Sequence, residues 1–140
     1  MALRLRKNEK LELIAKVPLF AGLSKADLGK VAAIADEIDL PEGKALTRQG
    51  ERGREFFVLL DGEVEVRRNG RKLATRRAGE FIGEIALVSD RPRVATVTAT
   101  KPVSALVIRD VEFRALISRT PQIAVKVLQA VADRLPSDAA

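Results

Sequence analysis

Three residues with useful binding chemistry, Gly83, Glu84 and Arg93, lie close together in the sequence. A glycine that opens a short helical turn lets backbone N–H groups approach an anion closely, and the N-terminus of such a turn carries partial positive charge. Arg93 adds a forked, permanently charged donor that suits a phosphate. A phosphate would repel a neighbouring glutamate, so Glu84 must serve a hydroxyl group, as on a ribose. The three residues therefore predict a pocket for a sugar phosphate.

Each of these residues also has a purely structural interpretation. Glu84 and Arg93 could pair with each other and hold a loop. Gly83 could be only a turn residue, which agrees with either interpretation. Arg91 is a second cation nearby, but Arg93 directly follows the conformationally fixed Pro92 and is the better ligand candidate.

The composition removes most catalytic chemistry. The 140-residue chain contains no cysteine and no histidine, which excludes disulfides, cysteine nucleophiles, histidine bases and the usual zinc, copper and iron sites. We therefore expect no enzyme and no bound metal. Apolar runs such as 56–60 and 103–108 are far shorter than the ~20 residues that span a bilayer. The sequence is typical of a soluble, cytoplasmic module that does not insert into a membrane.

The net charge of +6 is unevenly distributed. Basic residues crowd around Asn69-Gly70, a hairpin turn signal: Arg67, Arg68, Arg71, Lys72, Arg76 and Arg77. Such a cluster could bind nucleic acid or acidic lipid. However, no phenylalanine lies within it and the chain has no other aromatic residue, so the stacking platforms of a single-strand binder are missing. We interpret the cluster as the solvated face of an exposed hairpin and expect no direct contact with nucleic acid.

Helical patterns frame both ends of the chain. Residues 1–35 predict N-terminal helices, with Ser24 as the N-cap of the second one. Residues 110–135 predict two C-terminal helices, and Thr120-Pro121 is a typical start for the last. The last helix carries a broad apolar stripe, which is normally core.

Residues 36–109 instead show short β-type segments separated by turn residues. Asp61-Gly62 and Asn69-Gly70 are the firmest turns, because both dipeptides accept positive φ. The segment 103–108 is apolar on both faces and predicts a buried strand. Regular spacing of this kind indicates an antiparallel sandwich or barrel. At this length we expect a single domain, 1–140.

A more specific signal comes from two runs: Gly83-Glu84-Ile85-Ala86-Leu87 and Pro92-Arg93-Val94-Ala95-Thr96-Val97. At this spacing they resemble the phosphate-binding cassette, here residues 81–97, of the cyclic-nucleotide-binding domains. That family comprises regulatory modules of cyclic-AMP-dependent kinases, nucleotide-gated channels and catabolite-activator-type transcription factors. The resemblance covers nearly the whole chain. It implies an α+β fold in which residues 36–109 form an eight-stranded antiparallel, jelly-roll-like β-roll, followed by C-terminal lid helices.

The resemblance also implies roles for individual residues. Glu84 should accept the ribose 2′-hydroxyl, and Arg93 should pair with the cyclic phosphate, with N–H groups of Ala86 and Val94 as further donors. Members that favour cyclic GMP often carry threonine after the arginine, so Val94 favours cyclic AMP, while cyclic GMP stays an alternative because Thr96 should share the face of Val94. The expected ligand contacts are Gly83, Glu84, Ile85, Ala86, Arg93, Val94 and Ala95.

Family members close the pocket with a residue of the final helix, often aromatic or arginine. The final helix of this chain has no aromatic residue, and Arg134 is the candidate cap. A guanidinium stacked on a purine contributes about 0.5–2 kcal/mol. Two alternatives stay open: Arg134 could be a solvated cation at the helix end, and Leu128, Val131 and Leu135 could form an apolar lid.

The leading hypothesis is a sensor that binds cyclic AMP and transmits occupancy through its C-terminal helix. Its partner would be an effector domain or chain, such as a channel pore, a kinase or another catalytic domain. One alternative is the ligand-binding fragment of a catabolite-activator-type regulator, which needs a helix-turn-helix after the final helix. Another is a ligand-free dimerisation module, against which the presence of both Glu84 and Arg93 argues.

Overall fold

The computed structural model of the protein describes residues 6–133. Helices lie at both ends of the chain: α1 (Lys7–Ala15), α2 (Lys25–Ala33), α3 (Asp110–Arg119) and α4 (Pro121–Asp133), with the short 3-10 helices η1 (Pro18–Phe20) and η2 (Glu84–Leu87). The strands between them are β1 (Ala35–Leu40), β2 (Ala45–Thr47), β3 (Glu55–Asp61), β4 (Glu63–Arg68), β5 (Arg71–Arg77), β6 (Phe81–Ile82), β7 (Thr96–Ala99) and β8 (Val103–Arg109). Across residues 6–133, no helix is long and apolar enough to cross a membrane.

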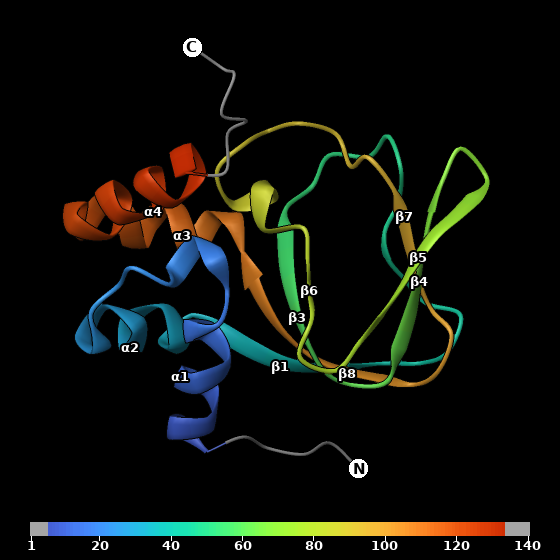
Figure 1. Ribbon diagram of the computed structural model, residues 1–140, viewed down its shortest axis with the longest axis horizontal. Helices are drawn as coiled ribbons and strands as arrows, with labels where there is room; N and C mark the ends of the chain where they lie inside the picture. Colours follow the sequence, from blue (N-terminus) through green and yellow to red (C-terminus); the bar gives the residue numbers. More distant parts are fainter. Residues whose placement is uncertain (1–5, 134–140) are drawn as a thin grey trace.

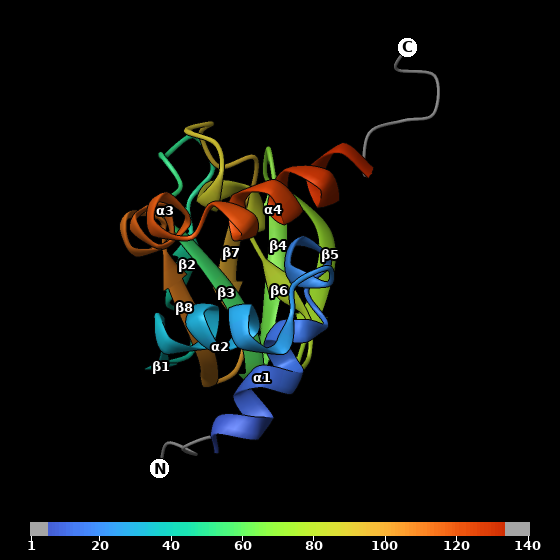
Figure 2. The ribbon, with the colours of Figure 1, turned by 90° about the vertical axis from the view of Figure 1, so that its left-hand side faces the viewer.

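The eight strands form two four-stranded antiparallel sheets, in the orders β1-β8-β3-β6 and β2-β7-β4-β5. All four helices gather beside the first sheet, which separates them from the second sheet (Figure 1). Figure 2, seen from the helix side, shows α3 and α4 across the upper part of this sheet and α1 and α2 below them. The predicted α+β class and eight-stranded β-roll are confirmed.

Strands β3 and β8 are buried on both faces. They pair side by side, with Phe56 opposite Ile108 and Phe57 opposite Val107. Phe56 and Ile108 pack into the cluster formed with the helices, whereas Phe57 and Val107 pack into the cluster between the two sheets. Because side chains alternate along a strand, a strand that is apolar at every position needs a partner on each side. The fold supplies helices on one side and a second sheet on the other.

Local turn and capping signals are found where the sequence predicts them. Ser24 Oγ accepts a hydrogen bond from the Asp27 N–H at 3.2 Å and caps α2. Asn69 and Gly70 join β4 to β5 with φ of 52° and 79°. Gln49, from the segment after β2, holds this turn through bonds of 2.8 and 2.7 Å to Asn69. The basic side chains of the hairpin are exposed: Arg67, Arg68, Arg71, Lys72, Arg76 and Arg77.

Two glycines in these hairpins should respond differently to alanine. Gly62 and Gly70 both have positive φ, 97° and 79°, which costs roughly 1–2 kcal/mol for other residues. A Cβ at Gly62 would also lie 2.9 Å from the Val103 Cα, whereas one at Gly70 would have nothing within 4 Å. We expect Gly62→Ala to lower the free energy of unfolding, measured by urea denaturation, clearly more than Gly70→Ala. Equal losses would contradict the close approach of Gly62 to Val103.

Candidate functional site

The turn that the sequence predicts at Gly83 is present. Gly83 lies in the left-handed region, with φ 80° and ψ 30°, and leads β6 directly into η2. The Ala86 N–H donates to the Gly83 carbonyl at 3.0 Å and closes the first turn of η2. This N–H, expected to serve the ligand, is therefore engaged within the turn. The helical dipole of this turn begins at Glu84 and Ile85, beside the Arg93 side chain that a Cβ at Gly83 would meet.

Six of the eight predicted site residues line one cavity of about 280 Å³, close to the lower end of small-molecule pockets. Its lining is Gly83, Glu84, Ile85, Ala86, Arg91, Pro92, Arg93 and Val94. Glu84 and Ala86 are buried, whereas Ile85 and Val94 are exposed. Ala95 does not belong to this lining; its carbonyl accepts a hydrogen bond from Thr47 Oγ1 at 2.9 Å. Arg134, the candidate cap, lies outside the described residues.

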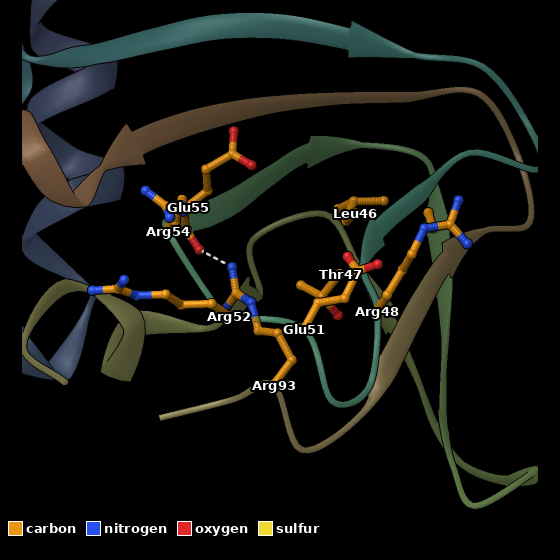
Figure 3. A pocket seen from close by; sticks show the side chains of 9 residues that line it. Leu46, Thr47, Arg48, Glu51, Arg52, Arg54, Glu55 and Arg93 are labelled. Carbon is orange, nitrogen blue, oxygen red and sulfur yellow. Dashed lines mark hydrogen bonds between the residues drawn. The ribbon is translucent and has the colours of Figure 1, made fainter. Parts of the chain in front are cut away.

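Arg93 is the half-buried cation in the lining of this cavity. Its side chain is half-buried, and its guanidinium Nη2 donates to the backbone carbonyl of Glu55 at the start of β3 (Figure 3). Burial lowers the pKa of Arg93 from its ordinary value, and the negative charge of Glu55 opposes this shift. No ion pair between described residues includes Arg93. A partly desolvated cation thus lies beside η2 with a carbonyl as its hydrogen-bond partner.

The loop between β2 and β3 forms the other side of the site, which the sequence does not predict. The Arg93 N–H donates to the Glu51 carbonyl at 2.7 Å, and the Gly50 N–H donates to the Arg93 carbonyl at 2.8 Å. Thr96 Oγ1 accepts the Gln49 N–H at 2.9 Å. Turn residues such as Gln49-Gly50 signal a loop here, but no local pattern pairs it with a segment so distant in sequence.

The hydroxyl of Thr96 is less available to a ligand than the sequence suggests. Strand β7 begins at Thr96, so Val94 lies in the bend before it and strand alternation does not place the two side chains on one face. The hydrogen bond from Gln49 further engages Thr96 Oγ1. Val94, by contrast, is 69% exposed beside the cavity.

A second cavity is lined by Arg93, strand β2, the β2–β3 loop and the start of β3 (Figure 3). Arginines are numerous in its lining, but the guanidinium groups of Arg48 and Arg52 point away from Arg93, in opposite directions. They do not converge on a common anion. Within residues 6–133, no group of His, Cys, Asp and Glu side chains is placed to hold a metal ion. Arg93 is the residue that the linings of both cavities share.

Asp90 links the cassette loop to the C-terminal helices. Its Oδ1 accepts hydrogen bonds from Arg52 Nη2 at 2.9 Å and from Arg114 Nη2, on α3, at 3.0 Å. Both bonds lower the pKa of the Asp90 carboxyl, and the bond from Arg52 has the larger effect. The bond to Asp90 in turn raises the pKa of Arg52. The three groups are exposed to solvent, so the contacts define geometry more than they add stability.

Comparison with known proteins agrees with this geometry. Residues 37–120 match the family model described as "Cyclic nucleotide-binding domain". The chain is 36% identical to a cyclic nucleotide-gated potassium channel of Rhizobium etli, over 88% of this chain and 34% of the channel. It is 37% identical to a cAMP-dependent protein kinase regulatory subunit of Mycosarcoma maydis, over 63% of this chain and 18% of the subunit. The chain thus spans about a third or less of these relatives.

A similar solved structure is the N-terminal domain of a transcriptional regulator from Streptomyces coelicolor A3(2). It superposes with a TM-score of 0.79 and is 31% identical, over 91% of this chain and 96% of that domain. The likeness therefore extends through the helices as well as the β-roll.

Asp90→Asn should loosen the cassette loop in a pH-dependent way. The hydrogen bonds of Asp90 depress its pKa, so their contribution is fully present above the unfolded-state pKa of about 3.9 and is lost as the pH falls through the lower folded-state pKa. We expect faster amide hydrogen exchange of residues 88–92 in the variant at neutral pH, and equal rates once Asp90 of the wild type is protonated. Asp61→Asn, an exposed carboxylate at the far end of β3, is the control. A difference that persists in acid would contradict this role of the carboxylate.

Proposed function

The chain belongs to the cyclic-nucleotide-binding domain family, and we propose that it binds cyclic AMP in the cavity between η2 and Arg93. The observation that carries this proposal is the Arg93 guanidinium, half-buried beside η2 with a backbone carbonyl as its partner. A desolvated cation is costly unless an opposite charge neutralises it. A cyclic phosphate carries one negative charge, and it can accept a forked pair of N–H donors from the guanidinium.

The neighbouring groups complement the rest of a nucleoside. Glu84 is buried in the same lining as Gly83 and Arg93, and we assign its carboxylate to the ribose 2′-hydroxyl. Ile85 and Val94 offer exposed apolar surface at the rim for a base. Val94 has no hydrogen-bonding group for guanine, and the Thr96 hydroxyl already accepts the Gln49 N–H. These features favour adenine over guanine.

We further propose that ligand binding is transmitted through the C-terminal helices. Leu87, at the end of η2, is fully buried in the helix-side core together with Phe113 of α3 and Ile123 of α4. Asp90 connects the next segment of the cassette to Arg114 of α3. A ligand that tightens η2 would therefore shift the packing of these helices, provided that it binds the two helix positions with different affinity.

The output of this module would lie in an effector domain or a partner chain, and the module itself would perform no reaction. Its relatives include a potassium channel and a kinase regulatory subunit, so we propose a regulatory role of that kind in the cytoplasm. A second candidate is the sensor domain of a transcription regulator, favoured by the likeness to the regulator domain of Streptomyces coelicolor over 96% of its length. The coding sequence around this segment separates the two, because one needs a pore or kinase partner and the other a DNA-binding domain.

Titration calorimetry with cyclic AMP and cyclic GMP tests the site directly. We expect micromolar or tighter binding of cyclic AMP, and a loss of about 2–5 kcal/mol in Arg93→Ala because the bound charge stays unpaired. This equals roughly 30-fold to several-thousand-fold in affinity. The control is Arg91→Ala, which removes the same charge from an exposed side chain of the same loop and should cost roughly fivefold or less.

Two outcomes would contradict these assignments separately. A folded protein that gives no heat with either nucleotide would refute cyclic-nucleotide sensing. Equal losses in Arg93→Ala and Arg91→Ala would instead refute the specific role of Arg93 and leave binding itself intact.

The choice of base depends on Val94. Val94→Thr adds a hydroxyl next to Arg93, and one hydrogen bond of about 0.5–1.5 kcal/mol to guanine should move the preference toward cyclic GMP by roughly 2- to 12-fold. Val94→Ala is the control, since it removes apolar surface without adding a donor. The measurement is the ratio of the two dissociation constants, and an unchanged ratio in Val94→Thr would place base selection elsewhere.

A further inference from the structure

The backbone of Arg93 is fixed by the β2–β3 loop on both of its polar sides. Its N–H donates to the Glu51 carbonyl at 2.7 Å, and its carbonyl accepts the Gly50 N–H at 2.8 Å. The preceding residue, Pro92, forms a β-bridge with Arg52. These bonds hold the Cα of Arg93 in place. The position of its guanidinium therefore depends on the residues that the side chain contacts.

Two glycines lie against the Arg93 side chain, one in the β2–β3 loop and one in the cassette. A Cβ at Gly53, in the β2–β3 loop, would be 2.7 Å from Arg93 Nε and 3.0 Å from both Cδ and Cζ. A Cβ at Gly83 would overlap Arg93 Nη1. The guanidinium thus lies against two bare α-carbons, while its Nη2 bonds to the Glu55 carbonyl (Figure 3). Ordinary carbon contacts are about 3.5–4.0 Å, so a Cβ at either glycine would displace the Arg93 side chain from this position.

Glycine is favoured at these two positions for different physical reasons. Gly83 has φ 80°, so its backbone alone already favours glycine. Gly53 is buried and does not have a positive φ, so a left-handed backbone is not what favours glycine there. At position 53 it is the Arg93 side chain, in the place where it lies, that conflicts with a Cβ.

We propose that Gly53 is a positioning residue of the anion site: its missing side chain lets the Arg93 guanidinium lie at the start of η2. Gly53 does not line the cavity formed by the cassette and acts through Arg93. Alanine at this position must push the guanidinium away from Gly83 or shift the loop that holds its backbone. That the anion is a cyclic phosphate rests on the proposed function, whereas the packing of Arg93 on Gly53 does not.

A double-mutant cycle with Gly53→Ala and Arg93→Ala tests this proposal. In the wild-type background, Gly53→Ala should weaken cyclic AMP binding by roughly 2- to 150-fold, the coupling expected of residues in direct contact. In the Arg93→Ala background the same change should alter affinity by about twofold or less, because the displaced side chain is gone. Equal factors in both backgrounds would overturn the proposal, since Gly53 would then act without Arg93.

The control is Gly22→Ala, another loop glycine outside the left-handed region. A Cβ there would meet Lys126 Cδ at 3.8 Å, an ordinary contact. The affinity should not change and the thermal midpoint should not fall, because an unstrained alanine restricts the unfolded chain. This variant measures the general effect of adding a methyl group to a loop of the domain.

The wild type, the two single variants and the double variant can also be compared by their thermal midpoints, which needs no nucleotide. Gly53→Ala should lower the thermal midpoint in the wild-type background and leave it unchanged in Arg93→Ala, where the space is vacant. If Gly53→Ala alone does not fold, the double variant should still fold; failure of both would overturn the proposal. Absence of nucleotide binding to the wild type would refute the proposed function, while the stability cycle would still decide the role of Gly53.

Discussion

Burial of both faces of β3 and β8 is the constraint on which the rest of the structure depends. These strands are apolar at nearly every position, and each exposed face would cost the roughly 25 cal/mol per Å² that burial of apolar surface contributes. The helices cover one face through Phe56 and Ile108, and the second sheet covers the other through Phe57 and Val107. At the start of β3 the Glu55 carbonyl accepts a hydrogen bond from the Arg93 guanidinium. Packing on both faces of the strand consequently fixes the position of this acceptor.

The site combines this rigid strand with two segments of irregular backbone. Irregular segments carry polar groups that need partners, and here the β2–β3 loop and the cassette supply them to each other through Gly50, Glu51 and Arg93. The cation is thereby brought close to the N-terminus of η2, where a partly desolvated guanidinium favours an anion. The hydrogen bonds that join the two loops therefore also fix the backbone of Arg93.

The same short segment also connects the site with the helices. Leu87 belongs to the core that includes Phe20 and Phe113, whose rings lie 5.8 Å apart, and tightly packed cores transmit displacement instead of absorbing it. Asp90 adds a polar contact to α3 at the surface. These two contacts are the physical basis of the proposal that ligand binding changes the packing of the C-terminal helices.

By itself the sequence determined the features that depend on neighbouring residues. The turn at Asn69-Gly70, the cap at Ser24 and the strand buried on both faces were predictable, because backbone preference and side-chain periodicity are local properties. The grouping of Gly83, Glu84 and Arg93 was predicted from the chemistry of these residues and from the family resemblance of the runs that contain them. Only the tertiary structure decided which loop would meet the cassette. The contacts of Arg93 with Gly53 and Glu55, the latter 38 residues away, depend on strand register and sheet order, and no local pattern encodes these because they emerge from packing of the whole domain.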